Sequence, residues 1–184
     1  MTLSKALAPS QSLLTRVVMV LGGSLFIALA AQVSVGFPVP MTLQTLAILI
    51  VGLSFGARMG ALTLVAYLAE GAMGLPVFAG GASAPALVGP TAGFLYGFVL
   101  MAWIAGYAAD RGARGVVTMT LAALVASALL YIPGLAWPAL VMGKTVPELL
   151  SGWMLPFLAG DAVKAVIAAL VVSGGWAALK NRKA

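Results

Sequence analysis

The chain has 184 residues, 62% of them hydrophobic and only 8% charged, and its mean hydropathy is +1.12. Because about a quarter of the residues of an ordinary soluble domain are charged, this composition excludes a soluble globule and predicts a single membrane domain over residues 1–184. The chain contains no Cys and no His, which excludes disulfide bonds, thiol nucleophiles, imidazole bases and the usual zinc sites.

Six apolar segments follow one another and predict an all-α bundle of six transmembrane helices. A straight span of a ~30 Å hydrocarbon core takes about 20 residues, so the second and third segments are short. Merging these two would place Arg58 in the middle of the membrane, and we therefore expect a tight turn between them. The expected spans are residues 17–35, 43–55, 59–73, 91–109, 116–135 and 156–179.

The first segment is rich in small residues, which let helices in a membrane approach closely. We expect Ser24, Ala28 and Ala31 to form a strip for docking another membrane subunit, with packing against helices of the same chain as the alternative. An A-x-A pattern at 28–30 resembles a signal-peptide cleavage site. Since the apolar run continues to residue 35, longer than most signal cores, we expect the segment to be retained.

Three places along the chain have features of a binding site. At the start of the second segment, Gln44 presents an amide that both donates and accepts hydrogen bonds. The connection 74–90 contains apolar Phe78, which favours a cover folded over a pocket rather than a loop in water. Thr91 follows Gly-Pro at the start of the fourth segment, where free backbone N–H groups favour an anion.

Asp161 and Lys164 lie three residues apart inside the last apolar segment, which carries no other charge until Lys180. Charges in a membrane-spanning helix are costly unless they face the protein interior and satisfy each other, so they indicate function by default. Residues i and i+3 lie on one helix face, and both side chains therefore reach the same pocket. The sequence predicts a binding site with an anionic acceptor beside a cationic donor. An ion pair that only ties helices together is the alternative.

The basic residues predict the orientation of the chain. A net charge of +6 would suggest a nucleic-acid partner in a soluble protein, but here eight of the ten basic residues fall on one side of the six-span arrangement. By the positive-inside rule both termini are cytoplasmic, and the connections 74–90 and 136–155 face outward. The eight residues are Lys5, Arg16, Arg58, Arg111, Arg114, Lys180, Arg182 and Lys183.

Four motifs together resemble the BioY family, the biotin-binding S-components of energy-coupling-factor (ECF) vitamin importers. They occur in the family's order over more than half of the chain. The resemblance implies a six-helix S-component fold in a bacterial inner membrane and capture of biotin from outside. It also implies a transmembrane coupling subunit and a pair of cytosolic ATPases as partners. The motifs are 39–45 (VPMTLQT), 67–81 (YLAEGAMGLPVFAGG), 89–97 (GPTAGFLYG) and 160–164 (GDAVK).

Biotin fits the residue chemistry that the resemblance brings together. We expect Asp161 to accept from a ureido N–H and Lys164 to donate to the ureido carbonyl or to the carboxylate. We expect Tyr67, Phe78 and Tyr96 to supply apolar walls, and Gln44 and Thr91 to add polar contacts. Glu70 stands where an apolar residue is expected, so it either reaches the outer surface or adds an acceptor near the pocket mouth. We expect biotin to be transported unchanged, with no cofactor and no metal.

Two other functions are compatible with an intramembrane carboxylate. A self-sufficient secondary transporter would use Asp161 or Glu70 to carry a proton, but we detect no internal inverted repeat. An intramembrane enzyme would need a second carboxylate, His, Cys or a metal cluster nearby, and the four acidic residues of the chain are scattered. We therefore expect a binding protein rather than an enzyme.

Overall fold

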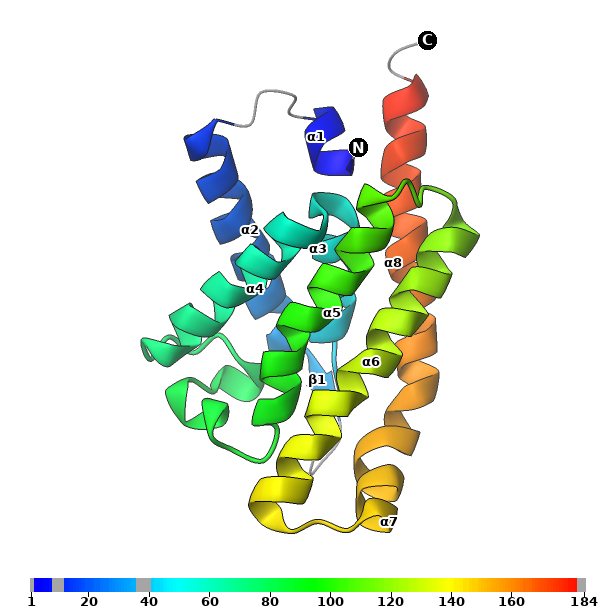
Figure 1. Ribbon diagram of the computed structural model, residues 1–184. Helices are drawn as coiled ribbons and strands as arrows, with labels where there is room; N and C mark the ends of the chain where they lie inside the picture. The colour runs from blue at the N-terminus through cyan, green and yellow to red at the C-terminus, as the bar shows by residue number, and fades with distance from the viewer. Residues whose placement is uncertain (1, 8–11, 36–40, 182–184) are drawn as a thin grey trace.

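A computed structural model of the chain describes residues 2–7, 12–35 and 41–181, and it is almost entirely helical. Figure 1 shows an elongated bundle with α1 and the C-terminal end of α8 at one end and α7 at the other. The elements are α1 (Leu3–Leu7), α2 (Leu13–Gln32), β1 (Ser34–Val35), β2 (Met41–Thr42), α3 (Gln44–Phe55), α4 (Ala57–Ala72), η1 (Ala79–Gly81), η2 (Ala84–Leu87), α5 (Ala92–Asp110), α6 (Val116–Met142), α7 (Val146–Leu149), η3 (Leu150–Met154) and α8 (Leu155–Asn181).

Six helices of the described chain are longer than ten residues, and they occupy the six predicted segments. α5 packs against α3, α4 and α6, and α8 packs against α3 and α6. By length and composition α2, α5, α6 and the stretch from α7 through α8 are long and apolar enough to cross a membrane, whereas α3 is apolar but shorter. Large apolar side chains such as Leu29 and Leu140 remain exposed, as expected for helices that face lipid.

A tight turn separates α3 from α4, as predicted. Gly56 adopts a φ of 86°, which favours glycine, and the backbone at this turn packs directly against Gly106 of α5. Asp110, at the end of α5, accepts a hydrogen bond of 2.9 Å from the backbone N–H of Ala57 and so satisfies the first turn of α4. The turn is therefore fixed by two positions on α5, which keeps the two helices separate.

The long loop predicted at 136–155 is wrong, because most of this stretch is helical. α6 continues through Pro133 and Pro138 to Met142 and ends at Gly143, which has a left-handed conformation. Prolines are tolerated in membrane helices because neighbouring helices and local adjustments satisfy the freed backbone groups. After a short link, α7 and η3 lead directly into α8, so the last helical stretch begins before residue 156.

The docking strip predicted on the first helix lies inside the chain. The exposed fractions of Ser24, Ala28 and Ala31 are 1%, 8% and 0%. The Ser24 hydroxyl donates a hydrogen bond of 2.7 Å to Glu70 of α4. The prediction was wrong because small residues permit close approach to any helix, and here the neighbour belongs to the same chain. The outward face of α2 carries large residues instead, among them Leu25, which is 58% exposed.

This burial predicts that Ala31→Trp destabilises the bundle whereas Leu25→Trp does not. An indole at the fully buried Ala31 has no space, and overpacking typically costs 1–3 kcal/mol or more. At Leu25 the indole points to lipid. Thermal unfolding of the two purified variants measures the difference, with the Ala31 variant expected to melt well below the parent. Equal melting temperatures for the two variants would contradict the packing of α2.

Candidate ligand-binding site

A cavity of about 180 Å³ lies between α3, α5, α6, α8 and the connecting segment 74–90. Most of its surface is apolar, and aromatic side chains form much of its wall. The polar lining comes from Thr42, Gln44, Thr45, Thr91, Asp161 and Lys164, and the aromatic lining from Phe78, Phe94, Phe98, Tyr131, Trp153 and Phe157. A mostly apolar pocket with a few convergent polar groups is typical of a site for a small organic ligand.

The charged pair on α8 faces this cavity. The Lys164 ammonium lies 3.6 Å from Oδ1 of Asp161, and the exposed fractions of the two side chains are 10% and 12%. Each charge has a closer neutral partner. Tyr131 of α6 donates a 2.6 Å hydrogen bond to Oδ2 of Asp161, and the Lys164 ammonium donates at 3.0 Å to the hydroxyl of Thr45 on α3. Three helices therefore hold the pair.

A second polar chain connects the cavity with its cover. Gln44 lines the cavity, and its side-chain amide donates a 2.7 Å hydrogen bond to the phenol oxygen of Tyr67. The Tyr67 hydroxyl in turn donates to the carbonyl of Val77 at 2.8 Å. Tyr67 is fully buried and does not line the cavity. Its side chain therefore anchors the segment that closes the cavity.

The segment 74–90 packs over the cavity as the sequence predicted. Phe78, Ala79, Ala82 and Ala86 line the cavity. The ring of Phe78 is 1% exposed, contacts Tyr67 edge-on with ring centroids 5.3 Å apart, and fills the space left by the missing side chain of Gly71. A side chain at this glycine would overlap the ring, so the position of Phe78 requires glycine at residue 71.

Comparison with known proteins identifies the family. The model of the BioY family matches residues 3–181, nearly the whole described chain. The chain belongs to the BioY family. A biotin transporter BioY from Rhizobium etli is 38% identical over 155 residues, covering 79% of this chain and 82% of the relative. A biotin transporter BioY from Thermotoga maritima is 37% identical over 141 residues, covering 73% and 79%.

The fold of this BioY family member resembles a solved structure. A crystal structure of the S-component for biotin from an ECF-type ABC transporter aligns with a TM-score of 0.77 over 95% of this chain and 96% of that chain. Sequence identity in this comparison is 22%, so the match shows a shared fold. An all-helical fold shared with that protein is therefore confirmed, whereas the number of spans and the position of the termini stay predictions.

Of the seven residues expected to line the site, five line the cavity, one lies behind its wall and one lies outside it. Asp161, Lys164, Gln44, Phe78 and Thr91 line the cavity. Tyr67 lies behind the wall and holds the cover.

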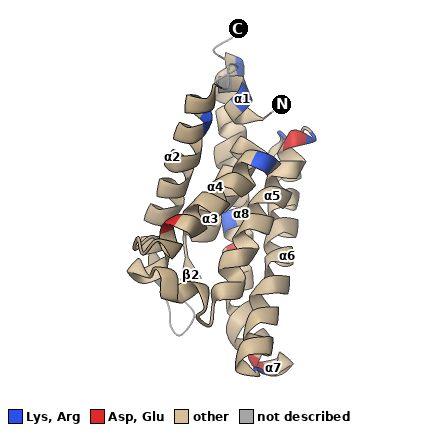
Figure 2. Cartoon of the chain, turned by 60° about the vertical axis from the view of Figure 1, so that its left-hand side comes forward, with Lys and Arg blue, Asp and Glu red and all other residues tan. Residues whose placement is uncertain are grey.

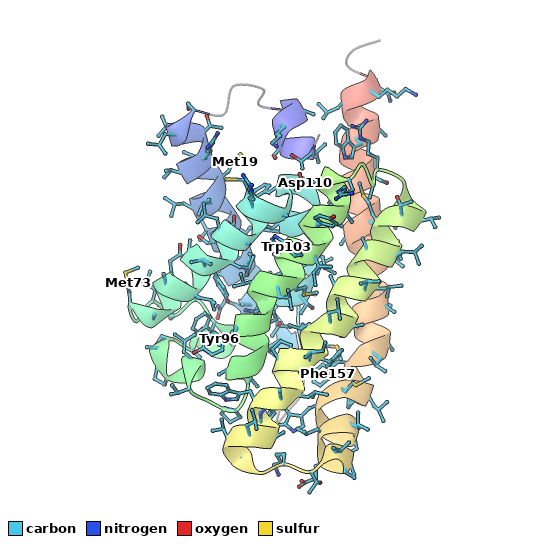
Figure 3. The ribbon with its side chains drawn as sticks, in the orientation of Figure 1. Met19, Met73, Tyr96, Trp103, Asp110 and Phe157 are labelled. Carbon is cyan, nitrogen blue, oxygen red and sulfur yellow. The ribbon has the colours of Figure 1, made fainter. Side chains whose placement is uncertain are left out.

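Tyr96 lies outside the cavity. It is 45% exposed, packs against Trp137 with ring centroids 5.8 Å apart, and donates a 2.7 Å hydrogen bond to the carbonyl of Leu87 in the cover. Figure 3 shows Tyr96 beside the connecting segment, away from Phe157 near α6 and α8. Tyr96 was expected to form an apolar wall, but its side chain projects from the outer side of α5 and ties down the cover instead.

Glu70 is also separated from the cavity. Its carboxylate accepts from Ser24 of α2, and it is not among the residues that line the cavity. A half-buried position between two helices explains why an acidic residue is tolerated where an apolar one is expected. Glu70 therefore neither adds an acceptor at the pocket mouth nor contacts the charged pair.

Several lining residues were missed from the sequence. Tyr131 lies in a predicted span with no charged neighbour to mark it, and only the fold brings it to Asp161. Trp153 and Phe157, near the start of the last helical stretch, also line the cavity. Thr45 was the one detectable from sequence, because it closes the 39–45 motif one residue after Gln44. Residues 36–40, which include Pro38 and Pro40 of that motif region, lie outside the described residues.

Proposed function

We propose that this chain is the substrate-binding subunit of a biotin importer and captures biotin from outside the cell. The observation that carries the proposal is the charged pair at the wall of a mostly apolar cavity rich in aromatic side chains, with Asp161 and Lys164 both facing it. Membership of the BioY family supports biotin as the ligand, since relatives with 31–38% identity bear the name biotin transporter.

Biotin has the chemistry that this cavity needs. Its ureido group offers N–H donors to Asp161 and a carbonyl acceptor to Lys164, and hydrogen bonds to ionised groups are the stronger ones away from water. Its bicycle and thioether are apolar and suit the ring faces of Phe78, Phe94 and the other aromatic residues of the wall. Thr91 lies at the start of α5, where it adds a hydroxyl for the polar parts of the ligand.

The proposed arrangement places six spans in a bacterial inner membrane with both termini in the cytoplasm. Figure 2 supports it, since most of the Lys and Arg positions, coloured blue, lie toward the end of the bundle that holds α1 and the end of α8. Lys144 lies at the opposite end, next to α7. Arg182 and Lys183, which also count toward this orientation, lie outside the described residues. The cover then faces outward, where biotin enters.

We propose that transport by this chain is powered by partners that use ATP. The sequence contains no G-x-x-x-x-G-K-[ST] loop for nucleotide phosphates. We therefore propose a transmembrane coupling subunit and a pair of cytosolic ATPases as partners, surrounded by membrane lipid and without nucleic acid. In this role the chain is not an enzyme and holds no cofactor, since biotin is the transported ligand.

Uptake of labelled biotin by cells that lack their own biotin transport tests this proposal. Cells that express the chain alone should bind biotin at the surface, and accumulation should require the coupling subunit and the ATPases. A secondary transporter, the alternative, would accumulate biotin by itself and would stop when a protonophore dissipates the proton gradient. Accumulation by the chain alone with this sensitivity would reject the proposal.

Sidedness gives a further prediction. The chain has no native Cys, so single cysteines report one site each. Cysteine in place of Ala82, a residue of the cover that lines the cavity, should react with an impermeant thiol reagent in intact cells, and biotin should protect it. Cysteine in place of Asn181 should react only after the cells are opened. Labelling of the Asn181 variant in intact cells would overturn the orientation.

A further inference from the structure

The charged pair is held open rather than closed. Hydrogen bonds between an ammonium and a carboxylate are typically 2.7–2.9 Å long, and a separation of 3.6 Å is not a hydrogen bond. The distance between the Lys164 ammonium and Oδ1 of Asp161 is 3.6 Å, although residues three apart on a helix are neighbours whose side chains can meet. An unrestrained pair in a low-dielectric cavity should close, since the Coulomb attraction grows as the separation falls.

Two neutral hydroxyl groups oppose that closure. Tyr131 draws the carboxylate toward α6 with a 2.6 Å hydrogen bond to Oδ2, and Thr45 draws the ammonium toward α3 with a contact of 3.0 Å. α3 and α6 both pack against α8, so the two hydroxyl groups act from different neighbouring helices. The Tyr131 ring is itself fixed, because it is 8% exposed and meets the ring of Phe94 edge-on at 89°.

We propose that Tyr131 and Thr45 are positioning residues that keep the Asp161–Lys164 pair open for a ligand. The carboxylate then retains acceptor capacity toward the cavity, and the ammonium retains an N–H that is not bonded to Thr45. A ligand group with an N–H and a C=O on adjacent atoms bridges both charges without first breaking a closed ion pair. The identity of that ligand as biotin rests on the proposed function, whereas the open pair rests on the geometry alone.

Loss of either hydroxyl should let the pair close and should therefore weaken ligand binding. Hydrogen bonds to charged groups are worth about 1.5–3 kcal/mol, which corresponds to roughly a 10- to 150-fold change in affinity. In the free variant, the closed ion pair replaces part of the lost hydrogen-bond energy. The ligand must then separate the two charges before it can bind, which lowers its affinity. We expect Tyr131→Phe and Thr45→Val each to lower biotin affinity about 10-fold or more.

Binding of labelled biotin to the purified variants is the first measurement. Thr45→Ser keeps the hydroxyl and should bind biotin within about threefold of the parent. If Thr45 acted through packing alone, Thr45→Val, which keeps the shape of the side chain, would bind better than Thr45→Ser. Tyr107→Phe removes a phenol hydroxyl on the exposed side of α5 and should leave affinity unchanged. Equal binding by Thr45→Val and Thr45→Ser would overturn the role of Thr45.

A double-mutant cycle separates positioning from general stabilisation. If Tyr131 acts through Asp161, the variant that combines Tyr131→Phe with Asp161→Asn should bind biotin no more weakly than Asp161→Asn alone. Additive losses in the two variants would show that Tyr131 acts elsewhere and would reject the inference. Absence of biotin binding by the parent would instead reject the proposed function. Should Tyr131→Phe not fold, the same cycle with Thr45→Val and Lys164→Ala decides.

Discussion

Replacing Asp161 with Asn or Lys164 with Ala is expected to lower biotin affinity more than 100-fold while the bundle stays folded. Both side chains are about nine-tenths buried and face the cavity, so the loss of one leaves the other charge without its partner. Removing one member of a buried pair typically costs about 3–5 kcal/mol, and each 1.4 kcal/mol is tenfold in affinity. Equilibrium binding of labelled biotin, together with thermal unfolding, measures the two effects separately.

The exposed pair near α7 is a matched control. Lys144 and Glu148 also have opposite charges, with a separation of 3.2 Å at i and i+4, but their exposed fractions are 35% and 49%. Exposed ion pairs contribute about 0–1 kcal/mol, so Lys144→Ala should leave biotin affinity and folding nearly unchanged. If the Asp161 and Lys164 variants also bound within threefold of the parent, the buried pair would be structural and the site assignment wrong.

Gly71→Ala is expected to weaken biotin binding by roughly 5- to 150-fold. A Cβ at this position would overlap the ring of Phe78, which must then leave the space it fills against Tyr67. Overpacking of this kind typically costs 1–3 kcal/mol. Because Phe78 belongs to the cover and lines the cavity, this cost destabilises the covered, ligand-bound state and so lowers the affinity for biotin. The measurement is the affinity for labelled biotin, with the dissociation rate expected to rise.

Two variants control for this interpretation. Gly22 of α2 has open space around it, so Gly22→Ala tests the same substitution in a helix without the overlap and should bind biotin normally. In a chain that already carries Phe78→Ala the overlap no longer exists, and adding Gly71→Ala should cost little further affinity. A full additional loss in that background would show that Gly71 acts without Phe78.

The sequence predicted the helices of this chain better than their ends. Six apolar segments became six long helices, because an apolar run of that length has few alternatives in a membrane. The connection expected at 136–155 is mostly helical, because α6 continues through Pro133 and Pro138 to Met142. Short elements were missed as well, since neither α1 nor α7 has enough residues for a periodic pattern.

The same limit applies to the site. Asp161 and Lys164 were detectable because charge in an apolar span is rare, and Gln44 because it opens a short segment. Tyr96 was expected in the site because it lies in the 89–97 motif, yet it ties down the cover from outside, whereas Tyr131, which lies in no motif, donates a hydrogen bond to Asp161. Only the rotation of each helix decides which tyrosine faces the cavity. The small residues of α2 are a similar case, because their spacing predicts close helix packing but does not tell whether the neighbouring helix belongs to the same chain or to another subunit.

Equilibrium binding of biotin to the purified chain, without any partner, tests the central claim most directly. Isothermal titration calorimetry should give one biotin per chain, and Asp161→Asn should abolish the signal at concentrations that saturate the parent. The same titration with Lys144→Ala should match the parent, because that residue lies at the surface next to α7. A folded parent that binds no biotin, or one whose binding survives Asp161→Asn unchanged, would contradict the account.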